Sequence, residues 1–169
     1  MTTSHTADYD VIAVGAGFAG ISLSYHLREA GLNTKIFGRA DDIGGTWTWN
    51  RYPGAATDSE SYYYCLTFSK EVLQEWSWTK RYSGWEETQA YLKFVMDKFS
   101  LWPSFQLSTE VESAEFDNET GLWNVHTGDG KTHTAKYFIS AMGMISQPVI
   151  PNIAGMDSFN GPLFHSSRW

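Results

Sequence analysis

Cysteine and basic residues are scarce in this chain: Cys65 is its single cysteine, and 12 Lys and Arg stand against 19 Asp and Glu. A lone cysteine excludes an intrachain disulfide and indicates a reducing compartment, so we expect a cytoplasmic protein. The net charge of −7 argues against nucleic acid or an anionic membrane as the partner. Apolar runs fall short of the roughly 18 residues that a membrane-spanning helix needs. No metal-ligand spacing is present either.

Aromatic residues, in contrast, are abundant, at 16% of the chain with eight Trp. They indicate a large flat ligand or an unusually aromatic core. A length of 169 residues with 42% apolar content is enough for one globular domain. Residues 1–7 are polar and lack the features of a secretion signal, so we expect them to form a flexible arm.

A β-α-β unit is predicted near the start of the chain. An unbroken apolar run predicts a buried strand over residues 8–14, and a glycine turn, Gly-Ala-Gly-Phe-Ala-Gly, follows at 15–20. Apolar residues at helical spacing then predict a helix over 18–30. A second short strand over 33–37 completes the unit, and the right-handed crossover makes the two strands parallel. The pattern predicts a Rossmann-like α/β fold.

The middle of the chain combines an irregular loop with one clear helix. Residues 38–68 have almost no periodicity but are rich in Gly, Trp, Tyr and Asn, and a loop of this length is more often functional than incidental. Ser83 is followed three residues later by Glu86, which predicts a capping box. The helix behind this capping box is expected over residues 85–99.

The second half predicts strands followed by a linker. Alternating residues and turn signals predict strands at 105–109, 111–116, 122–127 and 132–139. We expect them to form a small antiparallel β-meander beside the parallel sheet, with residues 137–141 returning to that sheet as a buried strand. Two prolines then restrict residues 147–151 to an extended linker.

The glycine turn is the first candidate binding site. A strand precedes it and a helix follows, which is the context that a dinucleotide-binding turn requires. Gly15 permits the tight turn, Gly17 lets the backbone approach a pyrophosphate, and Gly20 lets the helix pack closely on the strand. The helix N-terminus then offers free N–H groups to the phosphates. The alternative is a purely structural glycine turn.

The usual acidic partner of such a turn is missing. An Asp or Glu normally ends the second strand and binds the ribose hydroxyls, but that position holds Gly38, followed by Arg39. Asp41 and Asp42 come three and four residues later. Losing one charged hydrogen-bond partner costs about 1.5–3 kcal/mol of affinity, so we expect weakened binding.

Two longer motifs are far more specific. Residues 44–54 read Gly-Gly-Thr-Trp-Thr-Trp-Asn-Arg-Tyr-Pro-Gly, and the stretch 159–169 fits the pattern FxGxxxHxxxW. The pattern's defining residues are Phe159, Gly161, His165 and Trp169. Both motifs resemble those of the Baeyer–Villiger monooxygenases within the class B flavoprotein monooxygenases, and the resemblance runs from Tyr9 to Trp169. In related N-hydroxylating and flavin-containing monooxygenases the last position is usually Tyr or Phe, so Trp169 favours the Baeyer–Villiger branch.

The resemblance implies an FAD- and NADPH-dependent enzyme that uses O₂ and a C4a-peroxyflavin to turn a ketone into an ester or lactone. It implies that residues 8–143 form most of an FAD-binding domain. Residues 144–169 would be the linker towards an NADPH domain beyond Trp169. We therefore expect an incomplete domain that is inactive alone. A later chain segment would complete it.

Individual roles also follow from the resemblance. Gly15, Gly17 and Gly20 would hold the FAD pyrophosphate. The other cofactor contacts would be Thr46, Trp47, Trp49, Asp58, Tyr64 and Val111. Asp58 would support a catalytic arginine beyond Trp169 and contact the nicotinamide cofactor, while a carboxylate-held guanidinium stabilises a developing peroxide charge. His165 would organise the linker without touching substrate.

Other interpretations remain open at this point. Asp58 could be a turn or cap residue, and Trp47 and Trp49 could be ordinary core residues. The family usually reads Gly-Ala-Arg-Cys-Asp where this chain has Ala56 and Thr57 before the aspartate, which puts nicotinamide contacts there in doubt. The rival functions are an N- or S-oxygenating monooxygenase and an inactive, truncated nucleotide-binding remnant.

Overall fold

The computed structural model of the chain describes residues 6–169. The flexible arm predicted for residues 1–7 lies mostly outside this range. A single six-stranded sheet has the order β3-β2-β1-β6-β5-β4. Its strands are β1 Tyr9–Val14, β2 Thr34–Phe37, β3 Phe105–Gln106, β4 Val111–Asp117, β5 Leu122–Thr127 and β6 Thr132–Ser140.

The helices belong to the first two-thirds of the chain, with short 3₁₀ turns throughout. The α-helices are α1 Phe18–Glu29, α2 Thr46–Trp49, α3 Lys70–Glu75 and α4 Trp85–Lys98. The 3₁₀ turns are η1 Ser61–Tyr64, η2 Trp102–Ser104, η3 Met156–Ser158 and η4 Ser166–Arg168. No helix among the described residues is long and apolar enough to cross a membrane.

The strand order reverses at β1. This strand pairs in parallel with β2 on one side and with β6 on the other. In open α/β sheets, ligands bind in the crevice outside the carboxyl ends of the strands at such a switch point. The architecture therefore directs attention to the residues that follow β1, which are the glycine turn.

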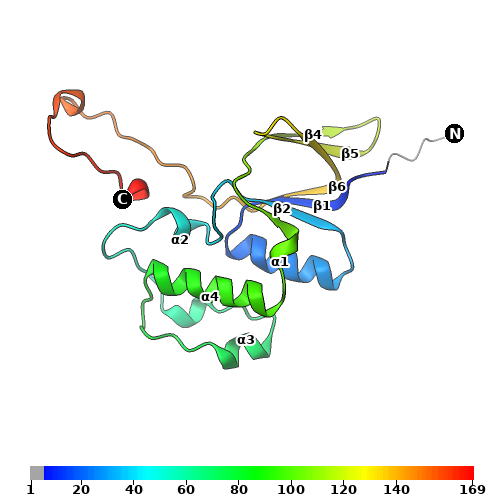
Figure 1. The fold of residues 1–169 in the computed structure, drawn as a ribbon, viewed down its shortest axis with the longest axis horizontal. Coiled ribbons are helices and arrows are strands. Elements are labelled where there is room, and N and C mark those ends of the chain that lie inside the picture. Colours follow the sequence, from blue (N-terminus) through cyan, green and yellow to red (C-terminus); the bar gives the residue numbers. More distant parts are fainter. Residues whose placement is uncertain (1–5) are drawn as a thin grey trace.

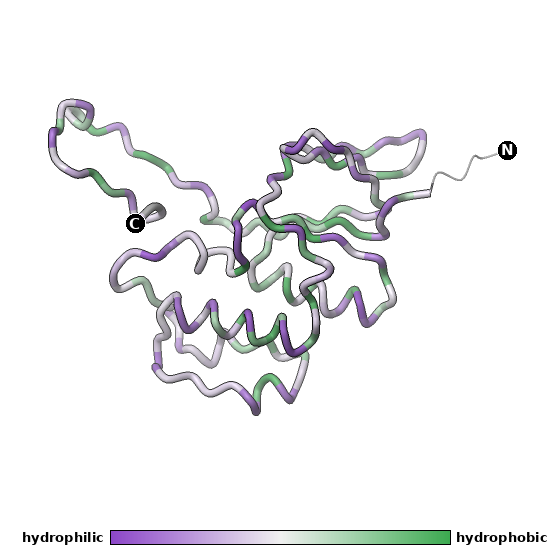
Figure 2. The backbone as a smooth tube through the Cα atoms, in the orientation of Figure 1, coloured by the Kyte–Doolittle hydropathy of each residue, from purple (hydrophilic) through white to green (hydrophobic). Residues whose placement is uncertain are grey.

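The parallel strands β1 and β2 are covered on both sides (Figure 1). The helices α1, α3 and α4 lie on one side of β1 and β2, and β4 and β5 lie on the other. Two buried clusters correspond to these layers. The helical cluster includes Ile21, Tyr91 and Val95, and the meander cluster includes Ile12 and Phe37. Figure 2 shows the apolar backbone segments converging between these layers.

The parallel β-α-β unit, helix α4 and the antiparallel meander are confirmed, but several details of the prediction are wrong. The strand predicted at 105–109 is only the two-residue β3, and it pairs in parallel with β2. Ser108 has a left-handed φ of 51°, which ends the extended conformation. The strands predicted at 132–139 and 137–141 are one strand, β6, which pairs antiparallel with β5 and parallel with β1.

The capping box is also wrong. Gly84 is the N-cap of α4 and no side chain caps this helix. The Ser83 hydroxyl pairs instead with the Thr88 hydroxyl at 3.2 Å. Ser83 cannot cap because its backbone is engaged elsewhere: its N–H donates to Ser61 Oγ and its carbonyl accepts from Thr57 N–H. The loop predicted at 38–68 likewise contains α2 and η1.

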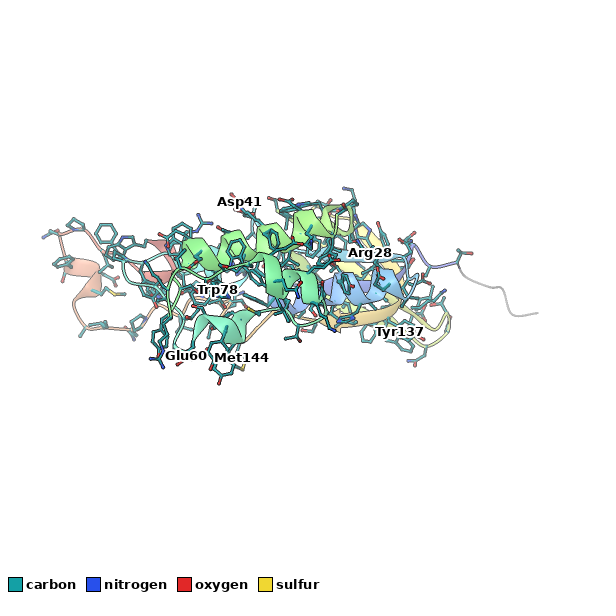
Figure 3. The ribbon with its side chains drawn as sticks, turned by 90° about the horizontal axis from the view of Figure 1, so that it is seen from below. Arg28, Asp41, Glu60, Trp78, Tyr137 and Met144 are labelled. Carbon is teal, nitrogen blue, oxygen red and sulfur yellow. The ribbon has the colours of Figure 1, made fainter. Side chains whose placement is uncertain are left out.

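Beyond β6 the chain leaves the sheet as an extended arm, residues 142–169, which returns beside α2 (Figure 1). Many of its apolar side chains are exposed, including Met144, Ile145 and Phe164. Figure 3, viewed from the helical side, has α3 and α4 in front of the sheet and Asp41 at the outer edge.

Candidate cofactor-binding site

The glycine turn is enforced by backbone crowding at the switch point. Gly15 has φ +120°, and a Cβ there would lie 2.3 Å from the carbonyl oxygen of Ala141, which follows β6. A Cβ at Gly20 would lie 1.9 Å from the Gly15 carbonyl oxygen. Real Cβ atoms do not approach this closely, so these positions accept only glycine, as the sequence predicts.

Gly17, the middle glycine of the turn, lies against the 44–54 loop. A Cβ at Gly17 would lie 3.4 Å from the Cα of Gly45, and a Cβ at Gly45 would lie 3.0 Å from the Cα of Gly17. The N–H of Gly44 donates to the Ala16 carbonyl at 2.8 Å. The glycine turn and the 44–54 loop therefore form one continuous surface, although residues 21–43 lie between them in the chain.

The N-terminus of α1 is left open at this surface. Its N-cap, Gly17, makes no side-chain hydrogen bond to the helix, and the first turn of this 12-residue helix holds no acidic residue. The first N–H groups of a helix have no partner within it, and the helix dipole favours an anion there. Uncapped donors next to a glycine surface suit the pyrophosphate of a dinucleotide such as FAD.

The predicted flavin contacts divide into two groups. Trp47 is buried and meets Tyr64 edge-to-face at 5.8 Å, and Phe18 of the glycine turn meets the same tyrosine at 5.5 Å. Trp49 is half-buried and lies 5.1 Å below the guanidinium of Arg39. Positions two apart on a helix point to opposite sides, so α2 presents the two tryptophans in different directions. Thr46, at the start of α2, is half-buried.

Gly38 occupies the position where a ribose-binding acid is usually found, and it is enclosed by the protein. It is buried directly after β2, and its N–H donates to the Gln106 carbonyl at 2.9 Å. Asp42 is engaged at both carboxylate oxygens: Oδ1 accepts from the Ile43 N–H at 2.8 Å, and Oδ2 accepts from Lys93 Nζ at 2.6 Å and from Gln89 Nε2 at 3.3 Å. The Asp41 side chain is exposed at the surface (Figure 3).

Helix α4 supports the 42–48 segment from below. Gln89 is buried, and its amide donates to the Ile43 carbonyl at 2.7 Å and to Thr48 Oγ1 at 3.3 Å. Tyr91, two residues further along α4 and fully buried, accepts the Leu66 N–H at 2.6 Å. Burial raises the pKa of Tyr91 to about 12, against the opposing effect of that N–H. Sequence reasoning missed Gln89, because a polar residue on a helix gives no local sign of being buried.

Asp58 follows a short bridge between the loop and α4. Ala56 pairs with Gly84, and the Thr57 N–H donates to the Ser83 carbonyl at 2.9 Å. The Thr57 hydroxyl is buried with no hydrogen-bond partner among the described residues. Asp58 itself is exposed. Its predicted role towards an arginine beyond Trp169 stays a prediction.

Val111 lies at the other end of the site. It is the first residue of β4, half-buried against the meander cluster. Its predicted place beside the adenine stays a prediction. No group of three or more His, Cys, Asp or Glu within residues 6–169 is arranged to hold a metal ion.

The 159–169 motif forms the last part of the extended arm. His165 Nδ1 accepts from the Ser167 N–H at 3.2 Å, and its Nε2 lies 3.3 Å from the Val149 carbonyl. This side chain therefore links the first part of the arm, near residue 149, to its last part. Trp169 is 64% exposed and lies 5.4 Å from the Phe164 ring. Phe159 is also exposed, and its ring lies over Gly161, 2.5 Å from the ideal Cβ position of that glycine.

Comparison with known proteins gives a consistent result. A model of the flavin-binding monooxygenase-like family matches residues 9–169. A Baeyer–Villiger monooxygenase from Pseudooceanicola batsensis is 43% identical over 96% of this chain, which covers 30% of that protein. A phenazine N-monooxygenase from Lysobacter antibioticus is 41% identical over 100% of the chain, which covers 31% of that protein.

Solved structures agree in fold. An oxidised steroid monooxygenase bound to NADP superposes with a TM-score of 0.90 at 41% identity, over 95% of this chain and 31% of the other. The OTEMO complex with FAD and NADP gives a TM-score of 0.91 at 34% identity, over 98% of this chain and 31% of the other. The chain thus spans less than a third of the length of these relatives. It belongs to the flavin-binding monooxygenase-like family, among relatives that include Baeyer–Villiger monooxygenases.

Proposed function

We propose that this chain forms most of the FAD-binding domain of a cytoplasmic Baeyer–Villiger monooxygenase. The observation that carries the proposal is the contact of Gly17 with Gly45. It joins a dinucleotide-binding turn to a loop with the flavin-loop sequence of that family. The enzyme would convert a ketone, O₂, NADPH and a proton into an ester or lactone, NADP⁺ and water.

The residues of the chain have separate tasks in this proposal. The open N-terminus of α1 binds the pyrophosphate, and the absence of a side chain at Gly17 lets the pyrophosphate approach the backbone closely. Trp47 and Tyr64 form an apolar wall that excludes water from the ring system of the cofactor. Asp58 orients the guanidinium of an arginine beyond Trp169, which stabilises negative charge at the reacting oxygen. The bound flavin would supply the activation of O₂ with electrons from NADPH.

The first test of this proposal is flavin retention. The purified chain is incubated with FAD, desalted and examined for the two visible absorption bands of oxidised flavin. We expect retained flavin, and we expect a Gly17→Ala variant, folded by circular dichroism, to lose it. Colourless but folded wild-type protein would contradict a self-sufficient FAD site.

A second candidate function is N-oxygenation. It is favoured by the phenazine N-monooxygenase relative, whose identity to this chain is close to that of the Baeyer–Villiger relative. Product analysis of a full-length enzyme with a cyclic ketone and with an aromatic nitrogen heterocycle separates the two functions. A lactone supports the first function, and an N-oxide without lactone supports the second.

A further inference from the structure

The site lacks a carboxylate where a dinucleotide-binding turn normally has one, and it lacks room for one. A Cβ at Gly38 would lie 2.9 Å from the Cβ of Ala16 and 3.0 Å from Cδ2 of Leu107. Ala16 belongs to the glycine turn, so a side chain at position 38 would displace the turn that binds the pyrophosphate. The ribose hydroxyls therefore need an acceptor from another element.

Glu110 is delivered to this place by backbone pairing. The Ser108 N–H donates to the Ala40 carbonyl at 2.8 Å, and the Thr109 N–H donates to the Gly38 carbonyl at 2.9 Å. The Glu110 carbonyl accepts the Gly128 N–H at 2.9 Å. The segment before β4 thus runs alongside the end of β2, and its backbone is held on both sides of residue 110.

The side chain of Glu110 also lies beside the end of β2, and we refer to this place, next to Gly38 and Arg39, as the corner. Its Oε1 lies 3.5 Å from Nη1 of Arg39, the residue directly after Gly38. The Glu110 side chain is 56% exposed, so the ion pair is weak and serves to orient the carboxylate. A carboxylate accepts several hydrogen bonds, and one ion pair leaves acceptor capacity for a hydroxyl donor.

We propose that Glu110 supplies the ribose-binding carboxylate of this nucleotide site in place of residue 38. This inference rests on the proposed FAD site and names the group that recognises the adenosine ribose of the cofactor. The carboxylate accepts hydrogen bonds from the ribose hydroxyls, and Arg39 fixes its orientation.

The charges at this corner select hydroxyls over a 2′-phosphate. An arginine near this position accommodates the 2′-phosphate in some dinucleotide sites. Here Arg39 is already engaged: Nη2 donates to the Ser146 carbonyl at 2.9 Å, and the guanidinium lies over Trp49. A phosphate at this corner would meet the Glu110 carboxylate, and this like-charge contact disfavours its binding.

The test is a cycle of two ligands and three proteins. FAD and an FAD analogue without the adenosine 2′-hydroxyl are titrated by fluorescence quenching against the wild type, Glu110→Ala and Glu112→Ala. Glu112 is the matched control, because it is an exposed acid two residues further along, at the start of β4, with Oε1 3.4 Å from the Cβ position of Gly128. Thermal melting establishes that each variant is folded.

We expect Glu110→Ala to weaken FAD binding at least about tenfold and to weaken binding of the analogue by less than about threefold. Glu112→Ala should leave both affinities within about twofold. Equal losses for both ligands in Glu110→Ala would overturn the assignment, and so would an unchanged FAD affinity in that variant. A wild type that binds neither flavin ligand removes the proposed cofactor site and this inference with it.

Discussion

Gly17 and Gly45 stand back to back, with the ideal Cβ position of Gly45 only 3.0 Å from the Cα of Gly17. One belongs to the turn after β1 and the other to the loop before α2. Their contact makes the phosphate-binding surface and the aromatic loop a single site, so a change at one glycine acts on both motifs.

Substitution within the glycine turn should separate binding from folding. A Cβ at Gly17 meets the protein at 3.4 Å, an ordinary contact, whereas a Cβ at Gly20 meets the Gly15 carbonyl oxygen at 1.9 Å. We expect Gly17→Ala to keep its melting temperature and lose at least about tenfold in FAD affinity. Gly20→Ala should lose about 1–3 kcal/mol of stability from overpacking. Equal melting temperatures for the two variants would contradict this reading.

Gln89 holds the flavin loop against α4. We expect Gln89→Leu to lower stability by about 1–3 kcal/mol, because its buried amide no longer bonds the Ile43 carbonyl. FAD affinity should fall with it, since the loop is freed. Denaturant unfolding and flavin titration measure the two effects. Gln74→Leu, at an exposed position on α3, is the control and should change neither.

The raised pKa of Tyr91 predicts a loss of folding stability at high pH. Its folded pKa is raised to about 12 from the ordinary 10.0, so between these values the folded state keeps a proton that the unfolded state releases. Stability should be complete below pH 10 and fall as the pH rises through the folded value. Tyr91→Phe should reduce this slope and cost about 1–3 kcal/mol at neutral pH, since the Leu66 N–H loses its acceptor. Tyr137→Phe, at an exposed position, should keep the wild-type slope.

The lowered pKa of Asp10 predicts a loss of folding stability at low pH. Hydrogen bonds from Lys136 and then from the Asn33 N–H lower the pKa of its carboxyl below 3.8. The stabilisation is therefore present above about pH 4 and is lost as the pH falls through the lowered value. Melting temperatures measured from pH 6 to pH 2 should show a shallower decline in Asp10→Asn than in the wild type. Asp41→Asn, at an exposed position, should follow the wild type.

The sequence alone determined the local elements and the family. The β-α-β unit, the glycine turn and α4 follow from apolar spacing and from glycine conformation, which depend on neighbouring residues. The 44–54 and 159–169 motifs identified the flavin monooxygenases, because each is a long contiguous pattern. The local prediction failed at Ser83, where backbone bonds to Ser61 and Thr57 outcompete capping.

The contacts between distant segments follow from the three-dimensional fold and not from any local pattern. The fold placed Gly45 on Gly17, Tyr64 against Trp47 and Arg39 over Trp49, and it made β6 one strand with a parallel and an antiparallel partner. It also brought Glu110 beside Arg39. These contacts depend on strand register and on backbone hydrogen bonds between residues far apart in the chain, which no local pattern of side chains encodes.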